Sequence, residues 1–146
     1  MFTSDDDLAR IARGIADTAL PKAEWSHAAH FAAALWRLRA GTIAGLPETI
    51  RRYNVASGTA NNDTSGYHET ITRASIAAAR AFLDKGPSDR PLFETANALM
   101  ASALGRSDWL LLYWRRERLF SVEARKAWVE PDLRPLPWPV TRDNSL

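Results

Sequence analysis

The sequence contains no cysteine. This absence excludes disulfide bonds, thiolate metal ligands and a cysteine nucleophile, and it leaves the redox compartment open. Long apolar runs are missing too, since none approaches the ~20 residues of a membrane-spanning helix, and we expect no membrane partner. Residues 1–10 are acidic and polar, without the basic and apolar parts of a secretory signal, so we expect a cytoplasmic protein.

The sequence has little excess charge of either sign. Its 19 lysines and arginines nearly balance 17 aspartates and glutamates, which gives a net charge of +2. The isoelectric point of about 9.3 reflects the predominance of arginine, which keeps its charge at high pH. So small an excess does not indicate a nucleic-acid partner, and we expect none. The one basic cluster with aromatic residues, 114–120, is predicted to be a solvated helix face.

Strand-like alternation and glycine-rich phosphate-binding motifs are also missing, and apolar residues recur at helical spacing almost throughout. We predict an all-α, single-domain bundle of roughly five to seven helices over residues 1–146. Two alanine-rich helices, at about 23–40 and from about 64 to 83, are expected at its centre. Four prolines follow residue 130, so residues 130–146 are predicted to form an extended tail on the surface.

Residues with strong preferences at helix ends mark the predicted boundaries. Serine accepts hydrogen bonds from the first backbone N–H groups of a helix, which favours N-caps at Ser4 (or Thr3), Ser107 and Ser121. Glycine adopts the left-handed conformation that often follows a helix, which predicts helix ends at Gly41 and Gly58.

The three histidines of the chain fall in two short motifs. His27 and His30 lie three residues apart, and His68 stands beside Glu69. Residues three apart on a helix point within about 60° of each other, so His27 and His30 share a face. Glu24 lies one turn before His27 on that face. Trp25 is expected to lie well away from His30.

These histidines support a first hypothesis, a metal-dependent enzyme that acts on a small polar metabolite. His27, His30 and His68 would hold a divalent metal ion such as Zn²⁺, Fe²⁺, Ni²⁺ or Mn²⁺ between the two central helices. Glu69 would be the catalytic base or a fourth ligand.

A second hypothesis is a metal-free enzyme or small-molecule binding protein that uses the same cleft. The catalytic groups would be His68, Glu69 and Tyr67, since imidazole titrates near neutral pH. The predicted ligand-binding residues are Glu24, Trp25, Asn62, Asp63 and Thr72. Asn62 and Asp63 fit either the mouth of a cleft or ordinary Asx turns.

A third hypothesis gives the histidines no chemical role. They would form a buried hydrogen-bond network that fixes helix register in an interaction module, for example a homodimer. The metal content of the protein separates the first hypothesis from the other two.

Three motifs occur together in this chain: W-S-H-x-x-H (Trp25 to His30), G-Y-H-E-T-I-T (Gly66 to Thr72) and R-L-F-S-x-E-A-R-x-x-W-V-E-P-D-L-x-P-L-P (Arg118 to Pro137). Their combination resembles a family of small, uncharacterised all-helical bacterial proteins, which implies a fold but no reaction. A looser similarity is to DinB-like helical bundles, and it implies that His27, His30 and His68 bind a divalent metal. That family pairs its histidines as H-x-x-x-H late in the bundle, whereas this chain has H-x-x-H early.

Overall fold

The computed structural model describes residues 1–140, and within this range the chain is all-helical. The predicted all-α bundle is confirmed. Residues 141–146 of the predicted tail lie outside the described residues. The seven α-helices of the described residues are α1 (Asp5–Ala16), α2 (His27–Ala40), α3 (Leu46–Ala56), α4 (Glu69–Lys85), α5 (Leu92–Ala101), α6 (Arg116–Leu119) and α7 (Val122–Lys126).

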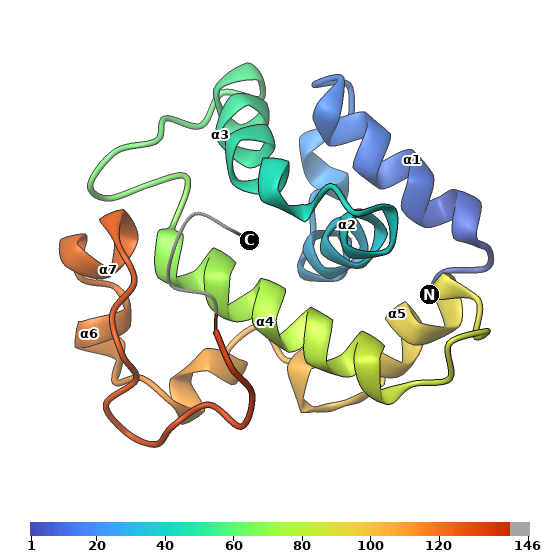
Figure 1. Ribbon diagram of the computed structural model, residues 1–146. Helices are drawn as coiled ribbons and strands as arrows, with labels where there is room; N and C mark the ends of the chain where they lie inside the picture. The colour runs from blue at the N-terminus through green and yellow to red at the C-terminus, as the bar shows by residue number, and fades with distance from the viewer. Residues whose placement is uncertain (141–146) are drawn as a thin grey trace.

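Helix α2 lies at the centre of the molecule, with α1, α4 and α5 in contact with it (Figure 1). Ser26 caps its start, because the Ser26 hydroxyl accepts a hydrogen bond from the Ala29 N–H. Gly41 ends it at a φ of 74°, as the sequence predicts. The residues from 31 to 35 are all buried, so α2 has no polar face along this stretch.

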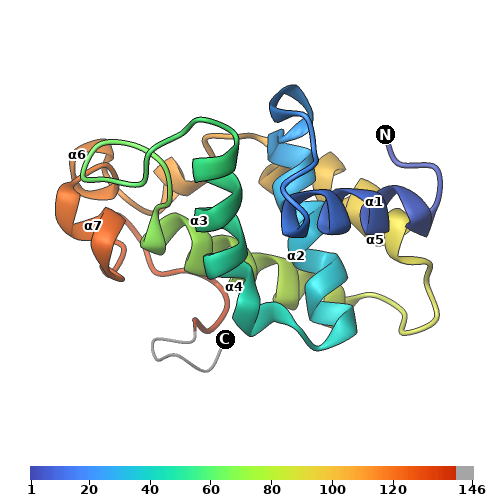
Figure 2. The same cartoon turned by 90° about the horizontal axis from the view of Figure 1, so that it is seen from above.

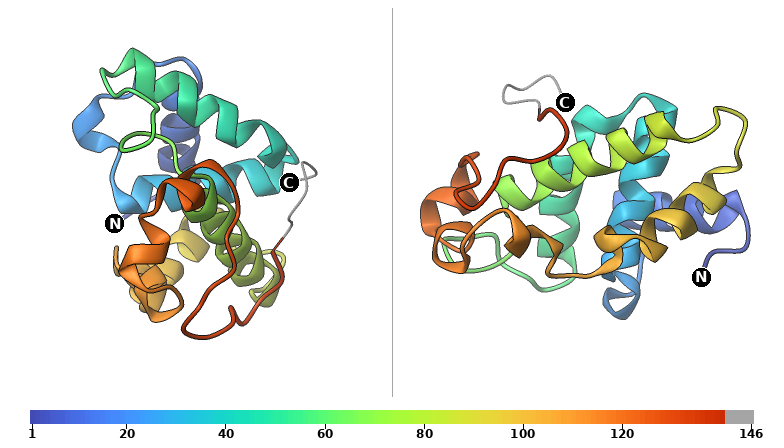
Figure 3. Two further views of the ribbon diagram at one scale, coloured as in Figure 1. Left: turned by 90° about the vertical axis from the view of Figure 1, so that its left-hand side faces the viewer. Right: turned by 90° about the horizontal axis from the view of Figure 1, so that it is seen from below.

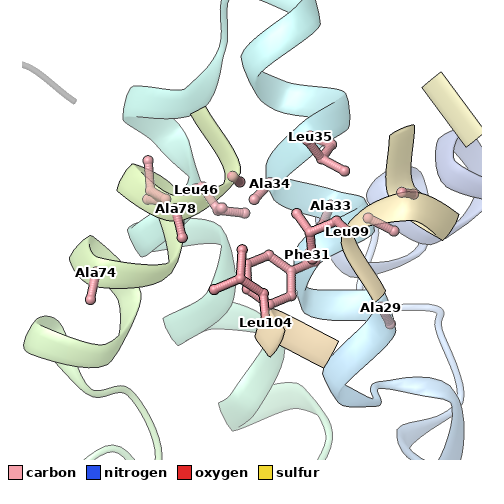
Figure 4. Packing of buried hydrophobic residues seen from close by; sticks show 14 of the residues in the cluster. Ala29, Phe31, Ala33, Ala34, Leu35, Leu46, Ala74, Ala78, Leu99 and Leu104 are labelled. Carbon is pink, nitrogen blue, oxygen red and sulfur yellow. The ribbon is translucent and has the colours of Figure 1, made fainter. Parts of the chain in front are cut away.

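Alanine side chains let α4 approach α2 closely. Ala74 and Ala78 of α4 and Ala33 and Ala34 of α2 are all buried. Figure 4 shows these alanines around the space that larger side chains such as Phe31 fill. The predicted pairing of two alanine-rich central helices is therefore present in the structure.

Helix α4 begins at Glu69 with His68 as its N-cap, and the prediction of a start near Thr64 is wrong. The preceding loop is organised by the Asn61 side chain. Its Oδ1 accepts hydrogen bonds from Asn54 Nδ2 and from the Tyr67 backbone N–H. Because these bonds use the loop backbone and the Asn61 amide together, residues 59–67 have a defined structure without being helical.

The segment after α5 is made of short 3₁₀ turns rather than one long helix. The predicted helix over 107–120 is broken into a 3₁₀ turn, Trp109–Leu112, and the single-turn helix α6. Trp114 lies between them, fully buried, and its indole Nε1 donates a hydrogen bond to the Val129 carbonyl. This long-range contact turns the chain where local periodicity alone would continue the helix. Figure 3 shows the chain running from α5 past α4 to α6 and α7.

Two of the predicted N-caps differ in outcome. The Ser121 hydroxyl accepts a hydrogen bond from the Ala124 N–H and caps α7, as predicted. Ser4 stands at the N-cap of α1, but its side chain makes no capping hydrogen bond to any residue within 1–140. The Asp7 carboxylate instead accepts hydrogen bonds from the Thr3 N–H and hydroxyl.

Residues 130–140 form no helix and pack along the surface, as the prolines predict. Leu136 and Trp138 are partly buried against the core, whereas Leu133 remains 48% exposed. The Leu133 N–H donates to the Tyr113 carbonyl, which ties this segment to the turns before α6. None of the helices in residues 1–140 combines the length and apolar character that crossing a membrane requires.

Gly105 is essential to the turn that follows α5. A Cβ at this position would collide with the carbonyl of Met100, so we expect Gly105→Ala to lower the free energy of unfolding by about 2–3 kcal/mol. The matched control is Gly86→Ala, where an added Cβ meets its nearest atom at 3.7 Å, an ordinary contact. Urea unfolding of both variants checks the difference, and equal stabilities would contradict this role for Gly105.

Candidate functional site

His68 joins the start of α4 to α6. Its Nδ1 accepts a hydrogen bond from the Ile71 N–H at 3.1 Å, and its Nε2 donates to the Leu119 carbonyl oxygen at 2.7 Å. The Leu119 carbonyl oxygen only accepts hydrogen bonds, so Nε2 carries a proton. Nδ1 accepts a hydrogen bond and therefore carries none, so the ring is neutral. Burial lowers the pKa of His68 and favours this neutral form. Both ring nitrogens are thus occupied by backbone groups of the protein itself.

Tyr67 and Glu69 come together, but in an ionic network rather than beside the His68 ring nitrogens. The Tyr67 hydroxyl donates to Glu69 Oε1 at 2.7 Å, and Arg73 Nε donates to Glu69 Oε2 at 2.6 Å. The Arg51 guanidinium lies 4.0 Å from the centre of the Tyr67 ring, and Thr72 lies beside the Tyr67 oxygen.

These contacts separate the pKa values of Tyr67 and Glu69. Burial and the hydrogen bond to Glu69 raise the pKa of Tyr67. Burial alone would raise the pKa of Glu69, but the hydrogen bonds from Tyr67 and Arg73 outweigh it and lower that pKa. Near neutral pH Tyr67 stays protonated and Glu69 stays ionised, so neither group is poised to exchange a proton there.

Asn62 and Asp63 lie on the exposed loop before α4. Asn62 Oδ1 accepts hydrogen bonds from the backbone N–H groups of Thr64 and Ser65, which is the Asx-turn alternative of the sequence analysis. Asp63 forms an ion pair with Lys126 of α7 at 3.1 Å. Both side chains therefore organise the loop and its contact with α7.

His30 lies in the first turn of α2 with one nitrogen in use. Its Nδ1 lies 2.7 Å from the Ser26 carbonyl oxygen, so Nδ1 carries the proton and the neutral ring keeps a lone pair on Nε2. Desolvation by surrounding protein atoms lowers the pKa of His30. The expectation that Trp25 lies away from His30 is wrong, because the two rings stack with centroids 3.7 Å apart. The reason is that α2 begins only at His27, so Trp25 precedes the helix.

His27 also uses one ring nitrogen. Its Nε2 donates to the Leu104 carbonyl oxygen at 2.8 Å and so holds the turn after α5 against α2. Glu24, predicted to share the face of His27, lies instead in a 3₁₀ turn and pairs with Arg10 of α1 at 2.9 Å. Glu24 is thus part of the contact between α1 and the start of α2.

The structure does not assemble the predicted metal site. Among residues 1–140, no three His, Asp or Glu side chains lie close enough to hold a metal ion. The physical reason is visible at the proposed ligand His68, whose two nitrogens are bound to backbone groups at the start of α4 and the end of α6. The donor set therefore does not fit a three-histidine metal centre.

His27 and His30 line a cleft of about 350 Å³ between the start of α2, the first half of α4 and the segment 107–120. Its apolar wall consists of Phe31, Ile71, Trp109, Leu110, Leu111, Leu119 and Phe120. Its polar lining consists of His27, His30, Ser75, Ser107, Asp108 and Arg116. As far as residues 1–140 form it, this lining does not include Tyr67, His68 or Glu69.

The charges of the cleft favour a negative group. Asp108 is the acidic residue of the lining, and Arg106 pairs with it at 3.3 Å. No carboxylate within residues 1–140 pairs with Arg116. Its guanidinium carbon lies 5.7 Å from the centre of the Phe120 ring, an exposed side chain of the same cleft.

The sequence patterns do not predict the cleft residues in 107–120, above all Arg116 and Phe120. A usable signal is present, because the cluster 114–120 mixes arginines with apolar and aromatic residues. That pattern also fits a solvated helix face, and only the break of the expected helix brings these side chains beside α2.

Comparisons of the chain with models of protein families, with curated proteins and with solved structures find no match. The resemblances carried by the three sequence motifs therefore stay predictions. Any functional conclusion depends on the geometry of the described residues.

We predict that His68 makes the stability of the protein depend on pH. Its pKa is lowered in the folded state, so between that value and the unfolded value near 6.5 only the unfolded chain binds the proton. The stabilisation by neutral His68 is complete above pH 6.5 and is lost as the pH falls below it. Urea unfolding from pH 7.5 to 5 should show a steeper loss for the wild type than for His68→Asn.

His68→Ala provides the second arm of this experiment. Both substitutions remove the imidazole N–H that donates to the Leu119 carbonyl, but asparagine retains an N-capping oxygen, whereas alanine removes the cap as well. We expect alanine to cost about 2–3 kcal/mol at pH 7.5 and asparagine about 1 kcal/mol less. Parallel pH profiles for all three proteins would rule out His68 as the titrating group.

Proposed function

We propose that the protein binds a small, largely apolar molecule in the cleft between α2, α4 and the segment 107–120, without a metal ion. The observation that carries this proposal is the cleft itself, with seven apolar side chains and a few polar groups at one site. Sites for small molecules are commonly apolar clefts of about 300–1,000 Å³ with a small number of polar groups that orient the ligand.

The walls come from segments that the fold holds firmly. Phe31 belongs to the buried stretch of α2, and Leu119 is buried and bound through its carbonyl to His68. The His27 bond to Leu104 fixes the turn that leads into the other wall. A cleft held in this way is available before the ligand arrives, which reduces the entropy lost on binding.

The metal-free alternative is favoured over the metal-dependent one by the state of the histidines. His68 has no nitrogen left to offer, and His27 and His30 each have one nitrogen bound to a backbone carbonyl. The remaining nitrogens of His27 and His30 can accept a hydrogen bond from a ligand in the same cleft. The hypothesis of a homodimeric interaction module stays a prediction.

Filling the cleft tests this proposal. We expect N-phenyl-1-naphthylamine, a neutral dye that fluoresces in apolar surroundings, to bind wild-type protein saturably with one dye per chain. Ser75 of α4 lines the cleft, so Ser75→Phe places a ring in the space and should weaken dye binding about tenfold or more. Fluorescence titration measures both dissociation constants.

Ser88→Phe is the matched control, because Ser88 lies in the exposed turn between α4 and α5 and not in the cleft. It should bind the dye as the wild type does, and circular dichroism should show that both variants are folded. Absence of saturable binding by the wild type, or equal binding by both variants, would contradict the proposal.

A further inference from the structure

We infer that the ligand of this cleft is an apolar molecule with a single carboxylate, which Arg116 binds beside His27 and His30. This inference rests on the proposed binding function and adds the chemical class of the ligand. It starts from the charges of the described lining, where Arg116 is the permanent cation and the carboxylate, Asp108, already pairs with Arg106.

Arg116 is the positive charge of this site that is available to a ligand. It lines the cleft, and no carboxylate within residues 1–140 forms an ion pair with it. Among residues 1–140, Asp108 is the one acidic side chain of the lining, and Arg106, which is not part of that lining, pairs with it. A guanidinium binds a carboxylate through two parallel N–H···O bonds, so an entering carboxylate finds a geometric as well as an electrostatic partner.

The apolar wall limits how much charge the ligand can carry. Arg116 lies by the Phe120 ring, and the cleft is also lined by Leu119 and Leu111; none of these three side chains offers a hydrogen bond. A group with two negative charges would find one permanent cation, Arg116, among the described lining residues, and its second charge would have no such partner. A carboxylate attached to an apolar body matches both the single guanidinium and the wall.

His30 makes the preference for an anion depend on pH. Neutral His30 presents a lone pair on Nε2, which does not attract a carboxylate, whereas protonated His30 presents a donor. The charged or titratable groups that line the cleft with His30 are His27 of α2, Asp108 before the 3₁₀ turn and Arg116 of α6, while α4 contributes uncharged Ile71 and Ser75. A bound carboxylate therefore favours proton uptake, and its affinity rises as the pH falls.

The experiment uses two probes of nearly the same shape, 2-naphthoate and the neutral 2-naphthamide. Each displaces N-phenyl-1-naphthylamine from full-length protein, and the two inhibition constants are compared. We expect 2-naphthoate to bind about tenfold more tightly than 2-naphthamide at pH 7. The ratio of the 2-naphthamide inhibition constant to the 2-naphthoate inhibition constant should increase as the pH falls from 7.5 to 5.5, a range in which 2-naphthoate stays ionised.

Arg116→Gln should reduce the ratio of the 2-naphthamide inhibition constant to the 2-naphthoate inhibition constant to near one, mainly by weakening the binding of 2-naphthoate. Arg115→Gln is the matched control, since Arg115 is an exposed neighbour that does not line the cleft. It removes the same charge from the protein and should keep the wild-type ratio. Equal loss in both variants would overturn the assignment to Arg116 and indicate a general effect of surface charge.

The outcomes distinguish this inference from the proposed function. Equal affinities of the wild type for the two probes would overturn the carboxylate inference and leave the apolar binding site intact. Displacement of the dye by neither probe, together with absence of dye binding, would overturn the proposed function itself. A ratio that does not change between pH 7.5 and 5.5 would overturn the part assigned to His30.

Discussion

The need to bury α2 on almost every side is the constraint on which the rest of the structure depends. From Phe31 to Leu35 the helix has no polar face, so α1, α4 and α5 must surround it (Figure 2). Its alanines allow close helix packing and leave little space in the middle of the bundle. The cleft therefore lies at the end of α2 where the apolar stretch stops, beside His27 and His30.

The irregular C-terminal third is attached to this core by histidine side chains. Short 3₁₀ turns leave carbonyl groups without intrahelical donors, and buried carbonyls need partners. His27 supplies a donor to Leu104, and His68 supplies one to Leu119. Neutral imidazole suits this task because it brings a single N–H on a rigid ring without a buried charge. The two bonds fix the turn that leads into segment 107–120 and the end of α6, where Leu119 lines the cleft.

Local sequence signals predict this fold well where local interactions decide it. The helical class, the end of α2 at Gly41 and the cap at Ser121 follow from periodicity and from residue preferences. The start of α4 and the break in 107–120 do not, because they depend on contacts between distant residues. Asn61 holds the loop through Asn54, and Trp114 turns the chain through Val129. The helical spacing of apolar residues in 107–120 therefore does not predict that this segment forms a wall of the cleft.

The three histidines differ in how many of their ring nitrogens are hydrogen-bonded to the backbone. This number distinguishes their roles better than their spacing in the sequence does. His68 gives both nitrogens to the backbone, so its contribution is to structure and to the pH dependence of stability. His27 and His30 each give one, and a carbonyl partner fixes which nitrogen carries the proton. In each of these two histidines, the hydrogen bond to a backbone carbonyl has a structural role. Because it places the proton on the bonded nitrogen, it also leaves the other nitrogen of the neutral ring with a lone pair. A structural role and a binding role are compatible in the same ring, and at the end of α2 the fold provides the conditions for both.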